Sequence, residues 1–132
     1  MRRASQSETC AVRAVARTAP PSLPYASMKD SVLGKKYELS LVFIGDHLAR
    51  KLNTQHRGKT YASNVLSFPN TKTEGEIFVN LTQAAREAKR LAVPFKSRVA
   101  LLYVHALYHL KGYKHSNRME RAEQRVLTAF NL

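Results

Sequence analysis

The pattern of hydrophobic and polar positions predicts three short β-strands. Residues 37–45, YELSLVFIG, alternate and are rich in β-branched and aromatic side chains, as strands are. Residues 62–68, ASNVLSF, predict a second strand that ends before Pro69, and residues 75–80, GEIFVN, predict a third. The polar stretch between the last two, PNTKTEG, predicts a tight connection.

Two helices are predicted next to these strands. Asp46 is positioned to cap a short helix, HLARKLNTQ, in which Leu48 and Leu52 share one face. Asn80 is positioned to cap a second helix, which extends to about Leu91.

Two further helices are predicted in the C-terminal part. Pro94 opens a helix over about residues 96–111, and Gly112 suits the left-handed position that ends it. Asn117, with a glutamate three residues later, resembles a capping box for a last helix that extends to about Phe130. The predicted order is strand, helix, strand, strand, helix, helix, helix. That order indicates an α+β fold in which helices pack on a small mixed sheet.

The first 27 residues have a different composition from the rest. Residues 1–27 are rich in Arg, Ser, Ala and Pro, contain one acid and show no sustained period. They also lack the apolar core of a secretory signal. We predict that these residues are a disordered tail, or that the start codon is assigned too far upstream and the protein begins at Met28. An organelle transit peptide is the alternative, because such peptides are also Arg-rich, Ser-rich and acid-poor. Residues 28–132 are then expected to form a single domain.

The chain is strongly basic, with 22 Lys and Arg against 9 Asp and Glu and a net charge of +13. Such a chain attracts polyanions through phosphate contacts and counterion release. There is no long amphipathic basic helix with Trp or Phe on its apolar face, and no apolar run of about 18 residues. We therefore expect a nucleic-acid partner and no membrane. Cys10 is the only cysteine, which excludes an intramolecular disulfide and fits a reducing compartment.

Three of the five histidines lie within eleven residues, in the stretch HALYHLKGYKH. His105 and His109 are four apart, so their rings lie one turn apart on one helix face. Gly112 allows the backbone to reverse, so His115 can return to the same side. Three neutral imidazoles suit one Zn²⁺ ion in a tetrahedral site, and a water at the open fourth position has its pKa lowered to about 7. The pattern predicts a catalytic zinc site on a helix that is followed by a glycine turn.

Two other interpretations of the histidines exist. A pair at this spacing often occurs by chance as core or surface residues, but three with a glycine between the second and third are harder to attribute to chance. Zinc peptidases share the spacing in H-E-x-x-H-x-x-G-x-x-H, where the glutamate after the first histidine is the general base. Ala106 occupies that position and cannot move a proton, which argues against a peptidase.

Three blocks resemble one known family. HALYHLKGYKH (105–115) is similar to the H-G-x-L-H-L-x-G-Y-D-H signature of the YbeY endoribonucleases. LNTQHRGKTYASNVLSFP (52–69) resembles that family's L-N-x-x-Y-R-G-K-D-x-P-T-[DN]-V-L-S-F-P, and GEIFVN (75–80) resembles its G-D-I-x-I strand. The blocks occur in the expected order, and the resemblance covers about residues 37–130.

The resemblance implies a zinc-dependent endoribonuclease that is selective for single-stranded RNA. It implies action on ribosomal RNA, notably at the 3′ end of the small-subunit RNA, a part in ribosome quality control, and a cytoplasmic location. Small-subunit ribosomal proteins are then candidate partners. The family's three zinc-ligand histidines fall on His105, His109 and His115, and its functional arginine falls on Arg57. A guanidinium can hold a phosphate bidentately and offset charge that builds on it, although such a residue is otherwise a solvated loop cation.

The sequence departs from the family pattern at several positions. Lys114 replaces the family's Asp before the third histidine, and Ala106 replaces the Gly after the first. The family's Pro-Thr is Ala-Ser at residues 62–63, and its Tyr before the arginine is His56. A cation beside zinc lowers metal affinity or adds a phosphate contact. The alternative function is therefore a non-catalytic, zinc-stabilised ribosome- or RNA-binding protein. Three lysines are candidate phosphate contacts: Lys59, Lys111 and Lys114.

Overall fold

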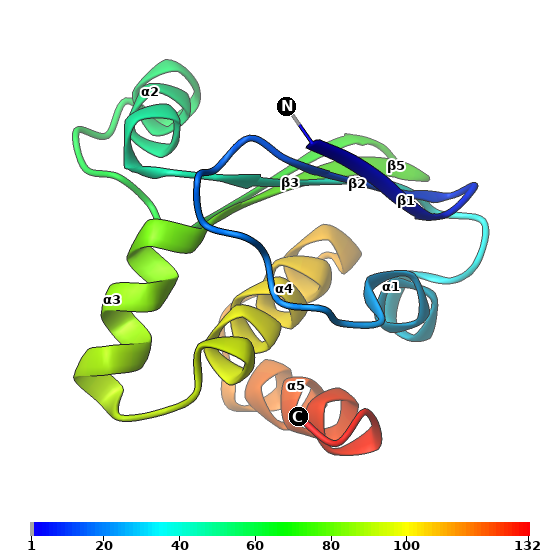
Figure 1. Cartoon of the computed structure of the whole chain (residues 1–132). Coiled ribbons are helices and arrows are strands. Elements are labelled where there is room, and N and C mark those ends of the chain that lie inside the picture. The colour runs from blue at the N-terminus through cyan, green and yellow to red at the C-terminus, as the bar shows by residue number, and fades with distance from the viewer. Residues whose placement is uncertain (1) are drawn as a thin grey trace.

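The computed structural model describes residues 2–132, and it describes side chains from residue 7 onward. The described chain forms a sheet with helices on both of its faces (Figure 1). The strands are β1 (Arg2–Ser7), β2 (Cys10–Ala14), β3 (Glu38–Ile44), β4 (Val65–Thr71) and β5 (Glu74–Asn80). The helices are α1 (Tyr25–Leu33), α2 (Asp46–Arg57), α3 (Leu81–Leu91), α4 (Phe95–Lys111) and α5 (Asn117–Ala129). The predicted α+β class is confirmed.

The sheet is mixed, as predicted, and has the strand order β1-β2-β3-β5-β4. The three central strands run parallel, with Leu41 of β3 in register with Val12 of β2 and Ile77 of β5. The outer strands β1 and β4 pair antiparallel with their neighbours. β4 is therefore an edge strand, and one of its sides is free of ladder pairing within the described chain.

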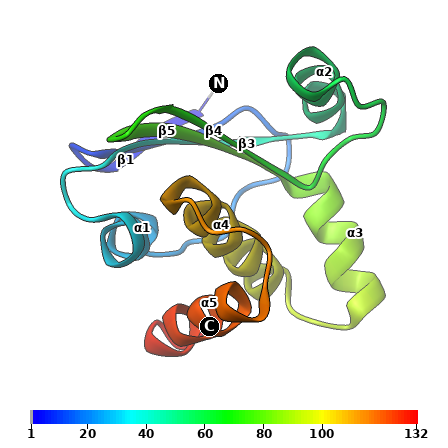
Figure 2. The same cartoon turned by 180° about the vertical axis from the view of Figure 1, so that it is seen from behind.

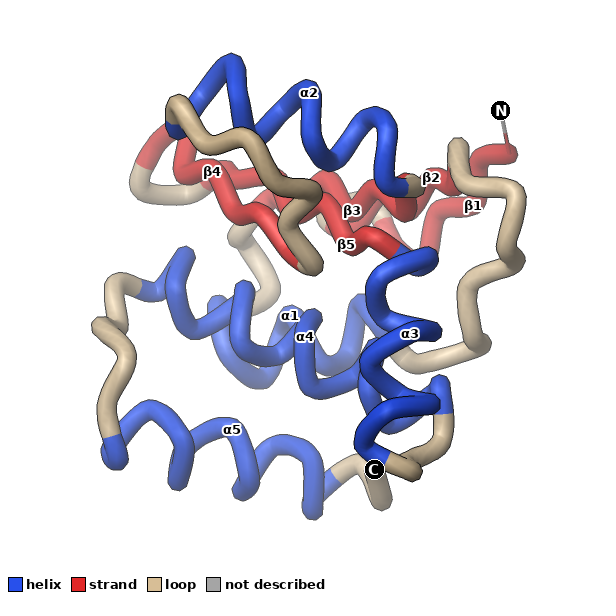
Figure 3. Tube along the Cα trace, turned by 90° about the vertical axis from the view of Figure 1, so that its left-hand side faces the viewer, coloured by secondary structure: helices blue, strands red, loops and turns tan. Residues whose placement is uncertain are grey.

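Helices cover the two faces of the sheet unequally. α4 lies against one face, with α1 beside it and α5 behind it (Figures 2 and 3). The side chains of Tyr103 and Leu107 on α4 are fully buried between these layers. α2 lies on the opposite face, where Ala49 packs with Val42 and Ile44 in a smaller apolar cluster. Because α4 is enclosed by the sheet and α5, it is a rigid platform for the side chains on its remaining face.

The prediction that residues 1–27 form a disordered tail is wrong for the described residues. β2 pairs in parallel with β3 along its whole length, and the chain continues into α1, which begins at Tyr25. Met1 lies outside the described residues. The physical reason is burial, because each of the following side chains is at most 8% exposed in the main core: Cys10, Val12, Ala14, Leu23 and Tyr25.

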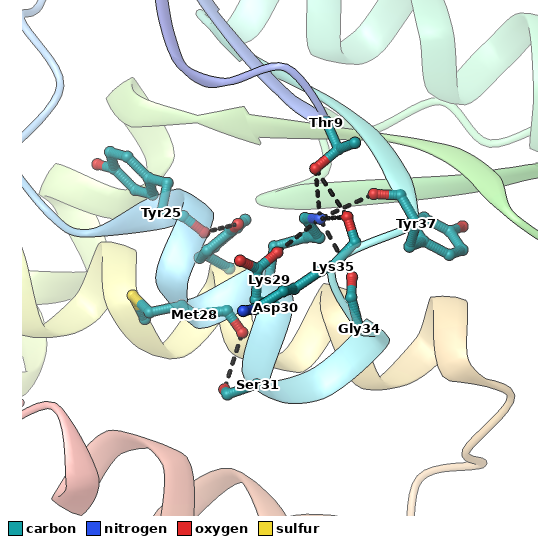
Figure 4. A network of polar contacts seen from close by, with 10 residues as sticks. Thr9, Tyr25, Met28, Lys29, Asp30, Ser31, Gly34, Lys35 and Tyr37 are labelled. Atoms are coloured by element: carbon teal, nitrogen blue, oxygen red, sulfur yellow. Dashed lines mark hydrogen bonds and ion pairs between the residues drawn. The ribbon is translucent and has the colours of Figure 1, made fainter.

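A buried lysine fastens this N-terminal part to the domain (Figure 4). Lys29 on α1 is fully buried, and its Nζ donates hydrogen bonds to Thr9 Oγ1 at 2.9 Å and to the carbonyl of Tyr37 at 2.8 Å. Nζ also lies 2.7 Å from Asp30 Oδ1. A buried charge is tolerated only when it is paired and hydrogen-bonded. These contacts meet that condition and tie the β1–β2 turn to α1 and to the start of β3.

Three local predictions need correction. β4 begins at Val65 and continues through Pro69, because an edge strand tolerates a residue that donates no ladder hydrogen bond. Gly45 is the N-cap of α2, and the Asp46 carboxylate accepts hydrogen bonds from Asn80 and Arg86 instead.

The cap of α5 also differs by one residue. Ser116, rather than Asn117, is the N-cap, and its side chain accepts a hydrogen bond from the backbone of Met119. The predicted cap of α3 is confirmed, because the Asn80 side chain accepts a hydrogen bond from the backbone of Gln83 at 3.2 Å.

Candidate functional site

α4 carries two of the predicted histidines on the face that the core leaves free. The helix follows its N-cap Pro94 and ends at Gly112, whose φ of 103° lies in the left-handed region, as predicted. His105 and His109 are one turn apart between fully buried neighbours such as Leu107. The backbone then turns away toward His115 and the start of α5.

Hydrogen bonds fix the orientation of both rings. Nδ1 of His105 lies 2.6 Å from Oε2 of Glu123, a carboxylate on α5 that is only 5% exposed. Nδ1 of His109 lies 3.2 Å from the carbonyl oxygen of Tyr113. Because a carboxylate and a carbonyl can only accept, Nδ1 of each ring carries the proton. In the neutral rings Nε2 is therefore the atom with a free lone pair.

The two free nitrogens face one another across a short gap. Nε2 of His109 lies 2.9 Å from Nε2 of His105, and the ring centroids are 4.5 Å apart. Two lone pairs at this distance repel unless a proton or a metal ion lies between them. Two ligands of a tetrahedral zinc ion are about 3.3 Å apart, given Zn–N bonds of about 2.0–2.1 Å. The pair therefore fits a zinc ion in donor type and tautomer, and nearly in spacing.

The third histidine is less closely placed. The ring of His115 lies 5.8 Å from that of His105, and its side chain is 71% exposed. Its Nε2 lies 3.9 Å from Oε1 of Glu120. Within residues 2–132, no group of three or more His, Cys, Asp or Glu side chains is arranged to hold a metal ion. The structure thus brings His105 and His109 together and leaves His115 at a distance from which its ring must turn inward to join them.

All four predicted site residues line one cleft of about 890 Å³ between the β4 edge and helices α3, α4 and α5. Arg57 reaches it from the C-terminus of α2, where its side chain is exposed. The other three are His105, His109 and His115. The candidate lysines are not among the lining residues: Lys59, Lys111 and Lys114. Lys111 instead donates a hydrogen bond to the carbonyl of Val32 on α1.

Burial influences the chemistry of His109. Burial, followed by the neighbouring ring of His105, lowers the pKa of His109, and hydrogen bonding to the Tyr113 carbonyl only partly offsets this. His109 is therefore neutral at physiological pH, which is the form that binds a metal.

Sequence reasoning missed two acidic residues that shape the cleft. Glu123 orients His105, and Glu87 on α3 holds Arg98 of α4 at the other end of the cleft. Both glutamates lie on helices with charged, exposed neighbours. Their sequence positions give no signal, because only the packing of α3 and α5 against α4 buries them.

Similarity searches identify related proteins. The sequence profile of the family described as Endoribonuclease YbeY matches residues 4–131. The YbeY endoribonuclease of Alkaliphilus oremlandii is 37% identical over 111 residues, which are 73% of this chain and 74% of that protein. The YbeY endoribonuclease of Phytoplasma australiense is 31% identical over 116 residues, which are 77% of this chain and 81% of that protein.

A solved structure has the same fold. The solution structure of TM1509 from Thermotoga maritima superposes with a TM-score of 0.64 at 20% identity, and it covers 88% of this chain and 86% of that one. Within residues 2–132, none of the helices is long and apolar enough to cross a membrane.

The fold, the histidine-lined cleft and these relatives define an α+β nuclease, an enzyme that hydrolyses RNA. The chain belongs to the YbeY endoribonuclease family, a family of metal-dependent hydrolases that act in ribosomal RNA processing.

Proposed function

We propose that this protein is a zinc-dependent endoribonuclease that cleaves single-stranded RNA and acts in maturation of the small-subunit ribosomal RNA 3′ end and in ribosome quality control, in the cytoplasm. The observation that carries the proposal is the pair of Nε2 atoms of His105 and His109, which face each other at 2.9 Å inside the cleft that Arg57 also lines. Family membership and the net charge of +13 support an RNA substrate.

His105, His109 and His115 are the residues that would hold a single zinc ion. When bound, the ion supplies a Lewis acid next to the scissile phosphate. Glu123 keeps the His105 proton on Nδ1, so the opposite nitrogen remains available as a ligand. The Tyr113 carbonyl has the same effect on His109.

Arg57 has a separate task in the proposed reaction. Arg57 lines the same cleft as the three histidines, and its planar guanidinium can hold two oxygens of one phosphate. Negative charge increases on those oxygens as a phosphodiester is cleaved, and a fixed cation lowers the energy of that state. Gly58 follows Arg57 in the left-handed conformation, with φ of 66°, and so ends α2 at this point.

The shape of the cleft supports the proposed selectivity for single strands. The cleft lies between an edge strand and three helices, and its walls combine polar and apolar side chains. An unpaired strand can enter such a cleft and place its bases against those walls. A duplex keeps its bases stacked and paired, so only its backbone could contact the rim.

The position of Lys114 argues against a direct contact of its side chain with the cleft. Its side chain is exposed, and it is not among the residues that line the cleft. The alternative of a non-catalytic, zinc-stabilised RNA-binding protein therefore gains no support from the position of Lys114.

The proposal is tested with a small-subunit ribosomal RNA fragment that carries an unprocessed 3′ extension, offered as a single strand or annealed to a complementary strand. We expect cleavage of the single strand near the mature end, loss of cleavage with a chelator and recovery with added zinc. Binding without cleavage would instead support the non-catalytic alternative, and equal cleavage of both forms would contradict the selectivity.

A further inference from the structure

We propose that Arg98, held by Glu87, forms a base-recognition subsite for a guanine near the cleavage position. This inference rests on the proposed function, because it concerns the RNA strand in the same cleft. Arg98 and Glu87 both line the cleft, and Arg98 lies near the start of α4, two turns before His105. Neither residue belongs to the histidine cluster or to the blocks that resemble the family motifs.

Glu87 is built into a dense network. Its side chain is 8% exposed and accepts hydrogen bonds from Nε of Arg98 at 2.9 Å and from Nε2 of Gln83 at 3.0 Å. The Asn64 side-chain amide, next to β4, donates to both carboxylate oxygens at 3.3 and 3.2 Å. The carboxylate therefore has a fixed position between α3, α4 and β4, and it fixes the guanidinium that it binds.

The contacts to Glu87 use only one edge of the guanidinium. Nε of Arg98 donates to Oε1 of Glu87, and Nη2 lies 2.8 Å from the same oxygen. The guanidinium has five N–H donors, and its outer edge presents two parallel ones on Nη1 and Nη2. Within the described chain, no hydrogen bond is formed by Nη1 of Arg98. The outer edge is thus a preorganised two-pronged donor beside the cleft.

Charge at this end of the cleft favours a base over a phosphate. Arg98 is paired with Glu87, so the two side chains together carry no net charge. A phosphate would gain little attraction there, whereas a neutral acceptor pair can bind without competing for the charge. Guanine presents such a pair in O6 and N7, and a bidentate Arg contact to these atoms is the commonest base-specific contact of proteins with DNA. The same edge of an unpaired RNA base is open to hydrogen bonding.

Position along α4 relates this subsite to the histidines. Arg98 and His105 are seven residues apart, which is two helical turns, so both side chains project from the same face. The rise between them is about 10 Å. A strand whose scissile phosphate lies at the histidines therefore places a neighbouring nucleotide, rather than the reacting one, against Arg98.

The test compares pairs of single-stranded RNAs that differ only by guanine or adenine at one position, scanned along both sides of the cleavage site. Both members of a pair compete in one tube, so the ratio of their kcat/KM values does not depend on the fraction of folded enzyme. Arg98→Ala is the main variant, and Arg98→Lys keeps the charge but loses the fork. Arg90→Ala is the matched control, because Arg90 is exposed on α3 and does not line the cleft.

We expect the wild-type protein to prefer guanine at one position, and Arg98→Ala to reduce that preference about tenfold. Arg98→Lys should also reduce it, Arg90→Ala should leave it unchanged, and 7-deazaguanine, which lacks N7, should weaken it. An equal loss of rate on all RNAs in Arg98→Ala would overturn the proposal and indicate a phosphate or structural role. The absence of a guanine preference at every position would overturn it as well. Binding of the same RNAs, measured by fluorescence anisotropy, tests the subsite even if no cleavage occurs.

Discussion

The buried carboxylate of Glu123 lies 2.6 Å from Nδ1 of His105 and thereby determines which nitrogen of that ring faces the cleft. Such carboxylate–histidine contacts orient metal ligands and raise their basicity. The contact joins α5 to α4, so the packing of the last helix is coupled directly to the geometry of the candidate metal site.

Replacing Glu123 with Gln should lower zinc affinity about 10–100-fold, as loss of a carboxylate behind a histidine ligand does elsewhere. The amide is the same size but holds the His105 ring less firmly. Zinc affinity is measured by competition with a chromophoric chelator, independently of RNA cleavage. Glu74→Gln is the control, because Glu74 is exposed on β5 and remote from the cleft lining. Equal zinc affinities of the wild-type protein and Glu123→Gln would show that Glu123 does not support the metal site.

Arg57→Ala should leave folding and zinc binding intact and lower kcat/KM for RNA by about 2–4 kcal/mol in transition-state free energy. Arg57→Lys should recover only part of the loss, because a point charge cannot reproduce the bidentate fork. Steady-state kinetics with thermal unfolding of each variant checks both statements. Full activity of Arg57→Ala would show that the cleft arginine has no part in the reaction.

A chain that begins at Met28 should be strongly destabilised. It lacks β2 and the buried Leu23 and Tyr25, so it exposes the edge of β3 and part of the main core. Within the full chain, Val12→Ala should cost about 1–3 kcal/mol of unfolding free energy. Val15→Ala is the matched control, because Val15 is 43% exposed, and it should change stability by less than about 0.5 kcal/mol. Urea titration measures all three, and an unchanged midpoint after truncation would contradict the described packing.

Stability should fall in acid partly through Glu87. The pKa of Glu87 is lowered in the folded protein. Burial alone would raise this pKa, but the hydrogen bonds from Gln83, Arg98 and Asn64 and the charge of Arg98 outweigh the effect of burial. A carboxyl whose pKa is lowered by folding stabilises the folded state at pH values above the pKa of the same carboxyl in the unfolded chain, which is about 4.3. The contribution is lost as the pH falls below that value and through the folded pKa. Urea unfolding at a series of pH values should show a smaller acid loss in Glu87→Gln, and an identical slope would exclude this carboxyl.

Local sequence patterns were sufficient for the elements that form the floor of the cleft. The period of α4, Pro94 before it and Gly112 after it were all readable, and the structure agrees within one residue. The same spacing placed His105 and His109 on one helix face, as they are found. These features depend on residues close together in the sequence.

Features that depend on contacts between residues far apart in the sequence could not be predicted from it. β2 is only five residues long, and its small buried side chains, such as Cys10 and Ala14, alternate with Arg13 in a segment rich in Arg and Ser. Its parallel pairing with β3 joins segments more than twenty residues apart. Lys29 on α1 is charged yet fully buried. A lysine on the buried face interrupts the apolar pattern by which that helix could be predicted from the sequence. The partners of Glu87 and Glu123 likewise depend on how the helices pack.

The most direct test of the central claim measures zinc content and RNA cleavage together in the wild-type protein, His109→Ala and His47→Ala, each purified without chelator or nickel resin. His47 is an exposed histidine on α2 that does not line the cleft, so it controls for loss of an imidazole. We predict one zinc ion per chain with cleavage for the wild-type protein and His47→Ala, and loss of both zinc and cleavage for His109→Ala. Cleavage that persists in His109→Ala without bound metal would contradict the account.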